Sequence, residues 1–120
     1  MLSRMFQQIT SLFCEPSPEY DERTAAQLQV FSKALCLYQF RSCPYCARVR
    51  RATNRLGLNI PERDVSQSVV FREELMRNGG SHIVPCLRIP DGDGAIWMYE
   101  SADIIEWLET RVAEICARHG

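Results

Sequence analysis

Two cysteines stand two residues apart in the segment RSCPYCARVRR, residues 41–51, which contains arginines but no acidic residue. A pair with this spacing can bind a metal, form a structural disulfide or act as a redox centre. A zinc site needs about four ligands, whereas the remaining cysteines are scattered singly and the histidines are His82 and His119. A structural disulfide stabilises mainly by closing a long loop, and Cys43 with Cys46 would close a short one. Of the three readings, the redox centre is favoured.

The expected position of the pair also favours redox chemistry. A short apolar strand is predicted to end just before it, and Pro44 suits a first helical turn because its missing N–H is not needed there. Cys43 is therefore predicted at or just before a helix N-terminus, where unpaired amides favour an anion and Arg41 and Arg48 add positive charge. Such surroundings lower a thiol pKa below about 8.5. Cys46 lies one turn further on, so the pair is interpreted as nucleophile and resolver.

The elements that must position this pair form a small mixed sheet covered by helices. The chain predicts helices at 1–13, 21–33, 44–56, 67–77 and 101–117, a proline-broken linker at 14–20, and strands at 34–40, 59–65, 84–89 and 95–99. From residue 34 the order is β-α-β-α-β-β-α, which implies a parallel pair joined by a right-handed crossover and an antiparallel hairpin turning at 91–94. We therefore divide the chain into an N-terminal helical extension with linker, 1–33, and one α/β domain, 34–120.

Length and composition limit the classes of protein. The 120 residues allow one compact domain, and a formal net charge of −1 leaves no basic excess for binding nucleic acid. No segment is apolar enough to span a bilayer, which needs about 20 residues. The N-terminal segment, interrupted by Gln7 and Gln8, lacks the continuous apolar core of a secretory signal. The predicted location is the cytoplasm, where the six cysteines would be mostly free thiols.

Three motifs in order carry a family resemblance. LYQFRSCPYCARVR resembles the first strand and active-site turn of glutaredoxins, and of the thioredoxin-fold domain that opens glutathione S-transferases. SHIVPCLRI resembles the Val-Pro strand of that family, and MYESADIIEWL resembles its last strand and helix. The match covers residues 35–118. It implies a thioredoxin-like (glutaredoxin) four-stranded mixed sheet, with 1–33 outside it.

The resemblance also implies glutathione as ligand and reductant, with no metal. The family's proline is cis and faces the reactive cysteine, so Val84–Pro85 is expected to be cis, with the Val84 backbone free to pair with an extended ligand. Ser101 is either only the N-cap of the last helix or, with Glu100, an anchor for the γ-glutamyl end of glutathione. Glu-Ser here is closer to the transferases than to the Gly-Gly-x-Asp of many glutaredoxins.

Some positions depart from the family's pattern. Many glutaredoxins place a lysine three residues before the first cysteine, where this chain has Phe40. Arg41, one step later, is expected to offer its charge to the glycyl carboxylate of glutathione. Tyr45 is expected either beside the ligand or as an exposed aromatic in the turn. Cys86, after the proline, is most simply a core residue.

The predicted function is a glutathione-dependent thiol–disulfide oxidoreductase, a dithiol glutaredoxin that reduces protein or glutathione mixed disulfides through Cys43 and Cys46. Its expected partners are glutathione and glutathionylated or disulfide-bearing proteins. Two alternatives remain. One is an iron–sulfur cluster carrier ligated by glutathione, disfavoured by the rigid Pro44. The other is a domain like those of glutathione S-transferases, disfavoured by the length of the chain.

Residues 1–13 are not explained by the resemblance. At helical spacing their apolar residues form one stripe, made of Leu2, Met5, Phe6, Ile9, Leu12 and Phe13. A helix this short is marginal alone in water, so the stripe is expected to be buried. Membrane-surface helices usually carry several basic residues, and this segment has only Arg4. Its expected partner is protein, through docking or self-association.

Overall fold

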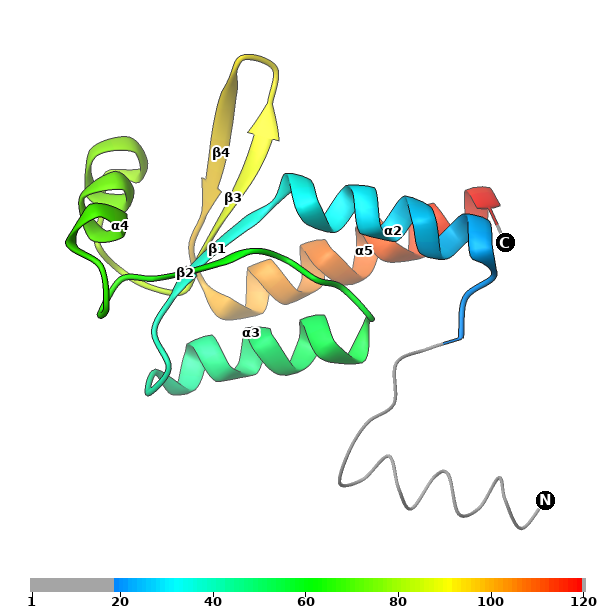
Figure 1. Ribbon diagram of the computed structural model, residues 1–120, viewed down its shortest axis with the longest axis horizontal. Helices are drawn as coiled ribbons and strands as arrows, with labels where there is room; N and C mark the ends of the chain where they lie inside the picture. Colours follow the sequence, from blue (N-terminus) through cyan, green and yellow to red (C-terminus); the bar gives the residue numbers. More distant parts are fainter. Residues whose placement is uncertain (1–18, 120) are drawn as a thin grey trace, which may run out of the picture.

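The computed structural model describes residues 19–119 (Figure 1). Its strands are β1 (Cys36–Gln39), β2 (Glu62–Asp64), β3 (Cys86–Asp91) and β4 (Gly94–Met98). Its helices are α2 (Glu22–Ala34), α3 (Pro44–Arg55), α4 (Val69–Glu74), the π-helical turn η1 (Leu75–Gly79) and α5 (Ser101–His119). From β1 onward the predicted order β-α-β-α-β-β-α is confirmed. The predicted helix at 1–13 and most of the linker lie outside the described residues.

The four strands form one mixed sheet in the order β2-β1-β3-β4. β1 and β2 are parallel, with Leu37 opposite Glu62. β1 and β3 are antiparallel, with Leu37 opposite Leu87, and β3 and β4 form an antiparallel hairpin. The crossover through α3 therefore joins the parallel pair, as the sequence predicts.

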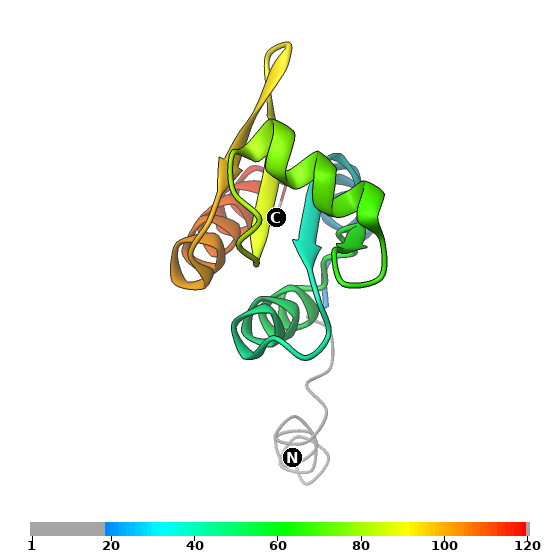
Figure 2. The ribbon, with the colours of Figure 1, turned by 90° about the vertical axis from the view of Figure 1, so that its left-hand side faces the viewer.

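Helices cover both faces of the sheet (Figures 1 and 2). α3 and α5 lie against one face with α2 beside α5, while α4 and η1 lie against the other. Because side chains alternate along a strand, Leu37 of β1 joins the apolar core under α3 and α5, whereas Cys36 and Tyr38 join a second core under α4. We call this second group the α4-side cluster; its buried members are Cys36, Tyr38, Val65, Leu75 and Cys86.

Helix α2 packs into the same domain as the sheet. The side chain of Asp21 caps it by accepting from the amide of Thr24 at 2.7 Å, and Leu28 lies in the core at 2% exposure. Ser32 is fully buried and donates to the carbonyl of Leu28. The division of the chain at residue 33 stays a prediction, and it falls within the last turn of this packed helix.

Several predicted boundaries shift. β2 is shorter than the predicted strand 59–65, and β3 begins at Cys86 instead of residue 84. Pro85 has no N–H to donate to a sheet ladder, so regular pairing starts one residue after it. Across the described residues, no helix has the length and apolarity needed to cross a membrane.

Candidate active site

Cys43 occupies the N-cap position of α3. Its backbone is extended, with φ −79° and ψ 119°, and Pro44 is the first helical residue. The amide of Cys46 donates to Cys43 Sγ at 3.4 Å, and the amide of Cys43 donates to the carbonyl of Phe40 at 3.3 Å. The thiol is thus in the place where a capping side chain normally accepts from the first turn. The predicted position at a helix N-terminus is confirmed.

Cys46 lies one turn inside the same helix and has no exposed surface. Burial raises the pKa of its thiol to about 12, and the neighbouring Cys43 adds to the rise. A hydrogen bond from the Phe40 backbone and the positive charge of Arg50 act in the opposite direction. At neutral pH Cys46 is therefore a protonated thiol beside the first sulfur. The described cysteines, Cys14 not being among them, are all free thiols.

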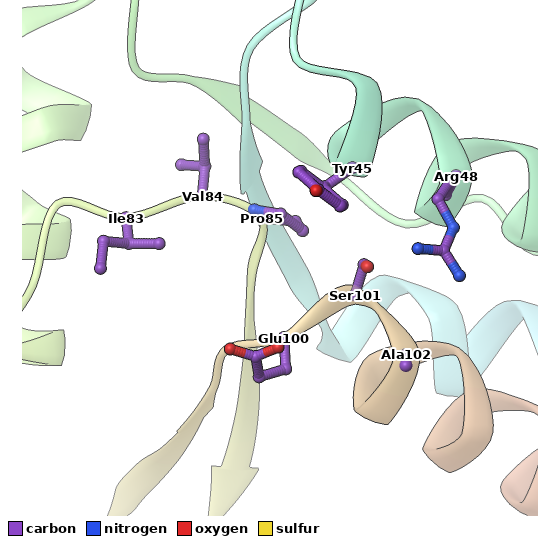
Figure 3. Close-up of a pocket in the computed structure, with 8 residues that line it drawn as sticks. All are labelled: Tyr45, Arg48, Ile83, Val84, Pro85, Glu100, Ser101 and Ala102. Carbon is purple, nitrogen blue, oxygen red and sulfur yellow. The ribbon is translucent and has the colours of Figure 1, made fainter.

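A pocket of about 340 Å³ opens beside this helix terminus. It brings together residues from the first two turns of α3, the loop before β3 and the start of α5 (Figure 3). Its lining residues are Tyr45, Arg48, Ile83, Val84, Pro85, Glu100, Ser101 and Ala102. The hydroxyl of Ser101 points from the start of α5 toward Tyr45, and the side chain of Arg48 points from α3 toward the start of α5 (Figure 3). Five of the residues proposed from sequence thus meet at one site: Tyr45, Val84, Pro85, Glu100 and Ser101.

The segment 83–85, which lines the pocket just before β3, has the expected backbone. The Val84–Pro85 peptide bond is cis, as the sequence resemblance implied. The pairing of β3 with β1 ends at Cys86 opposite Tyr38, which leaves the Val84 backbone outside the regular ladder. The pocket side of this segment can therefore offer backbone groups to an extended ligand.

Tyr99 is hydrogen-bonded to the loop that precedes this segment, at Gly79 and Ser81. Its hydroxyl lies 3.1 Å from the carbonyl oxygens of both Gly79 and Ser81, to which it donates. A hydrogen bond links the same hydroxyl to Cys86. Burial raises the pKa of Tyr99 to about 12, so the hydroxyl keeps the proton that it donates. The end of η1 is in this way tied to the end of β4.

The start of α5 differs from the prediction in one detail. The helix begins at Ser101, and the carbonyl of Glu100 accepts from the amide of Ile104 at 3.0 Å. Glu100, with φ +74°, therefore holds the N-cap position, and the prediction of Ser101 as the N-cap residue is wrong. Ser101 is the first helical residue, so its amide is one of those that an α-helix leaves without an intrahelical partner.

Arg41 does not line this pocket. It lies on a separate pocket of about 290 Å³, together with Arg50, Asn54 and Glu62. The cation of the first pocket is Arg48, which the sequence analysis considered only as a nearby charge. The signal that identifies it is helical spacing, because Arg48 lies three residues after Tyr45 and shares its side of α3. Ile83 was also missed, although it adjoins the predicted site residue Val84 in sequence.

The pocket carries opposite charges on two of its walls. Arg48 comes from α3 and Glu100 from the start of α5, and the ion pairs of residues 19–119 include neither of them. A ligand with both an anionic and a cationic group would match these walls. No cluster of three or more metal-ligating side chains occurs within that same range.

The fold and the cysteine pair together define a protein of the thioredoxin-like class. A family model described as "Glutathione S-transferase, N-terminal domain" matches residues 37–114. The chain belongs to this family.

The chain is similar to longer and to shorter proteins. It is 36% identical over 90 residues to prostaglandin E synthase 2 of Mus musculus. The matched region covers 74% of this chain but only 23% of that protein. An epsilon-class glutathione S-transferase from the housefly Musca domestica shares 22% identity and a TM-score of 0.53, over 65% of this chain and 35% of its own. The buckwheat glutaredoxin–glutathione complex shares 17% identity and a TM-score of 0.53, over 82% and 96% of the two chains. At such identities the structural likeness shows the fold alone.

Proposed function

We propose that this chain is a glutathione-dependent thiol–disulfide oxidoreductase of the dithiol glutaredoxin type. The observation that carries the proposal is Cys43 at the N-cap of α3, with the amide of Cys46 donating to its sulfur at 3.4 Å. Amides at a helix N-terminus stabilise an anion, and the thiolate is the nucleophile of disulfide exchange. Cys46 is a protonated thiol at neutral pH, and it becomes the second nucleophile when it loses its proton.

In the proposed cycle, the Cys43 thiolate attacks the glutathione sulfur of a mixed disulfide. A bond forms between Cys43 Sγ and that sulfur, and the substrate sulfur leaves as a thiolate that takes a proton from solvent. A second glutathione thiolate can then attack the glutathione sulfur of the adduct, which frees Cys43 and yields oxidised glutathione. Alternatively, Cys46 attacks Cys43 Sγ and releases glutathione. Two further glutathione molecules then reduce the Cys43–Cys46 disulfide.

The pocket supports glutathione as the ligand. The unpaired amides at the start of α5 and the Ser101 hydroxyl suit its γ-glutamyl carboxylate, and Arg48 adds a cation on the same side. Glu100 suits the adjoining ammonium group. The backbone of Val84 suits the cysteinyl residue, which would pair with it as an added strand. Arg41, on the other pocket, is not part of this binding site.

The test of the reaction is a glutathione-coupled disulfide reduction assay on three forms of the protein. Cys43→Ser should abolish reduction of every substrate. Cys46→Ser should retain reduction of glutathione mixed disulfides and lose reduction of protein disulfides, because only the latter needs the resolver. Cys116→Ser, on a half-buried residue of α5, is the matched control and should behave as wild type. Equal damage from Cys43→Ser and Cys46→Ser would contradict the assigned roles.

The test of the ligand site compares two arginines seven residues apart. Arg48→Met should raise the KM for glutathione several-fold, because a hydrogen bond between charged groups contributes about 1.5–3 kcal/mol when shielded and less at an exposed site. Arg41→Met should leave the KM unchanged. A larger effect at Arg41 than at Arg48 would show that the ligand lies elsewhere.

A transferase reaction is the second candidate, favoured by the family match over residues 37–114 and by Glu100-Ser101 at the start of α5. It would use the same pocket to hold glutathione for attack on an electrophile. Conjugation of glutathione to an aryl halide, measured beside the reduction assay, separates the two. Conjugation that survives in Cys43→Ser, with no disulfide reduction by wild type, would favour the transferase reaction.

A further inference from the structure

The peptide groups of Phe40, at the end of β1, serve both cysteines. The carbonyl of Phe40 accepts from the amide of Cys43 at 3.3 Å. The backbone of Phe40 also makes a hydrogen bond to the sulfur of Cys46 that favours its anion, which requires the amide as donor. Phe40 therefore contacts the backbone of Cys43 and favours the anion of Cys46.

Arg50 holds it. From the second turn of α3, the Arg50 guanidinium donates through Nη1 to the side-chain oxygen of Gln39 and to the carbonyl of Phe40 at 3.5 Å. Its Nη2 donates to the carbonyl of Arg41 at 3.1 Å. The planar fork of arginine thus spans three consecutive residues, and the Gln39 side chain that it meets is 3% exposed.

Arg50 differs from the other arginines of the helix. Arg48 and Arg51 are exposed, and Arg55 pairs with Glu109 at 3.1 Å. Among the described residues no carboxylate pairs with Arg50, and its acceptors are the neutral oxygens already named. Its charge is therefore not neutralised by a partner, and it acts on Cys46.

We propose that Arg50 is a positioning residue for the resolving step, a proposal that rests on the oxidoreductase function above. In that step Cys46 loses its proton, its sulfur bonds to Cys43 Sγ, and glutathione leaves as a thiolate that takes up a proton. Arg50 fixes the Phe40 peptide between the two cysteines, and its charge stabilises Cys46 while that sulfur is anionic. The first step needs only the Cys43 thiolate, and the amide that donates to this sulfur comes from the first turn of α3.

The experiment isolates the second step in the full chain. Reduced protein is converted to the adduct of Cys43 with glutathione, and release of glutathione is followed against pH together with the Cys43–Cys46 disulfide by mass spectrometry. Arg50→Met should slow release about tenfold or more, since a misplacement of about 1 Å can cost that much, and should move its pH profile to higher pH. Turnover of a small glutathione mixed disulfide, measured on the same variant, should stay within about twofold because it bypasses Cys46.

Two further variants keep the test decisive. Arg50→Lys retains the charge without the fork, so it should restore the pH profile and only part of the rate. Arg51→Met, one residue along on the exposed face, should resemble wild type in both measurements. If wild type and Arg50→Met release glutathione from the adduct equally fast, Arg50 has no specific role in resolution. The same holds if Arg50→Met slows both this release and the turnover of the small mixed disulfide, together with a lowered Tm. If wild type itself forms no Cys43–Cys46 disulfide, the failure lies with the proposed function. Should Arg50→Met not fold, an Arg50→Lys variant with wild-type rate and pH profile would equally overturn the proposal.

Discussion

Two regions of this molecule each bury a pair of thiols. Cys43 and Cys46 lie at the start of α3, and Cys36 and Cys86 lie in the α4-side cluster of the sheet. Cys46 and Cys86 are both completely buried, and burial raises the pKa of each to about 12. Burial alone therefore does not distinguish a redox pair from core residues.

The difference lies in the neighbouring backbone. Cys43 is outside its helix, where amides of the first turn are free to donate to its sulfur. Cys36 and Cys86 are on paired strands, opposite Arg88 and Tyr38 respectively, so their amides belong to the sheet. The α4-side cluster surrounds them with large side chains, whereas the helix that Cys43 caps contributes Tyr45 and Arg48 to a pocket. Cys43 and Cys36 are almost equally exposed, at 8% and 6%, so the free amides of the helix terminus are what favours reactivity at the first pair.

The largest expected difference is in catalysis. Cys43→Ser should remove disulfide reduction, a loss of at least about a hundredfold, whereas Cys86→Ala should keep turnover within about twofold and lower stability by roughly 1 kcal/mol. Turnover and thermal unfolding of the two variants provide the measurement. A catalytic defect in folded Cys86→Ala as deep as that of Cys43→Ser would remove the distinction between the regions.

The next difference is in alkylation of the reduced protein near neutral pH. Iodoacetamide should modify Cys43 more than about tenfold faster than Cys46 or Cys86, because only the thiolate reacts and the raised pKa values keep the latter two protonated. Peptide mapping by mass spectrometry gives the site-specific rates. Comparable rates at Cys43 and Cys86 would mean that the helix terminus confers no reactivity.

A smaller effect is expected from the pocket that only the first region has. The double change Glu100→Gln with Ser101→Ala should raise the KM for glutathione a few-fold and leave the fold intact, since both groups are offered to the ligand's γ-glutamyl end. Glu106→Gln, exposed on the same helix, is the control. An unchanged KM in the double variant would place the ligand elsewhere.

The smallest effect is on stability at high pH. Because the folded-state pKa of Cys86 is raised from 9.0 to about 12, its contribution to stability is complete below about pH 9 and is lost as the pH rises toward 12. Thermal unfolding should therefore show a Tm that declines over this range, and less steeply in Cys86→Ala. Equal slopes would mean that Cys86 has an ordinary pKa in the folded chain.

Much of the fold and of the cysteine site could be predicted from the sequence. The Cys-Pro-x-Cys spacing after an apolar strand predicts the helix terminus, because the missing N–H of proline allows few other positions. The order of elements follows from alternating patterns and turn residues, which are local signals. The start of α5 was predicted, but its N-cap was misjudged by one residue, since Glu100 adopts a positive φ that is uncommon for a non-glycine residue.

The arrangement of the arginines could not be predicted. Arg41, Arg48 and Arg50 are close in sequence, yet they face a second pocket, the candidate site and the end of β1. The directions of Arg48 and Arg50 depend on how α3 is rotated against the sheet, and that rotation is set by packing of Val49 and its partners across the core. A long side chain near a motif therefore says little about its target until tertiary contacts are known.

The Tyr99 hydroxyl that bridges Gly79 and Ser81 leads to an expectation about evolution. A methyl group at residue 79 would come within 2.6 Å of that hydroxyl and 3.0 Å of the Trp97 ring, so glycine is needed there for its size. At Gly80 space is open, but φ is +88°, so glycine is favoured for its backbone and asparagine is the natural substitute. In an alignment of relatives, residue 79 should covary with residue 99, whereas residue 80 should alternate between glycine and asparagine independently of both.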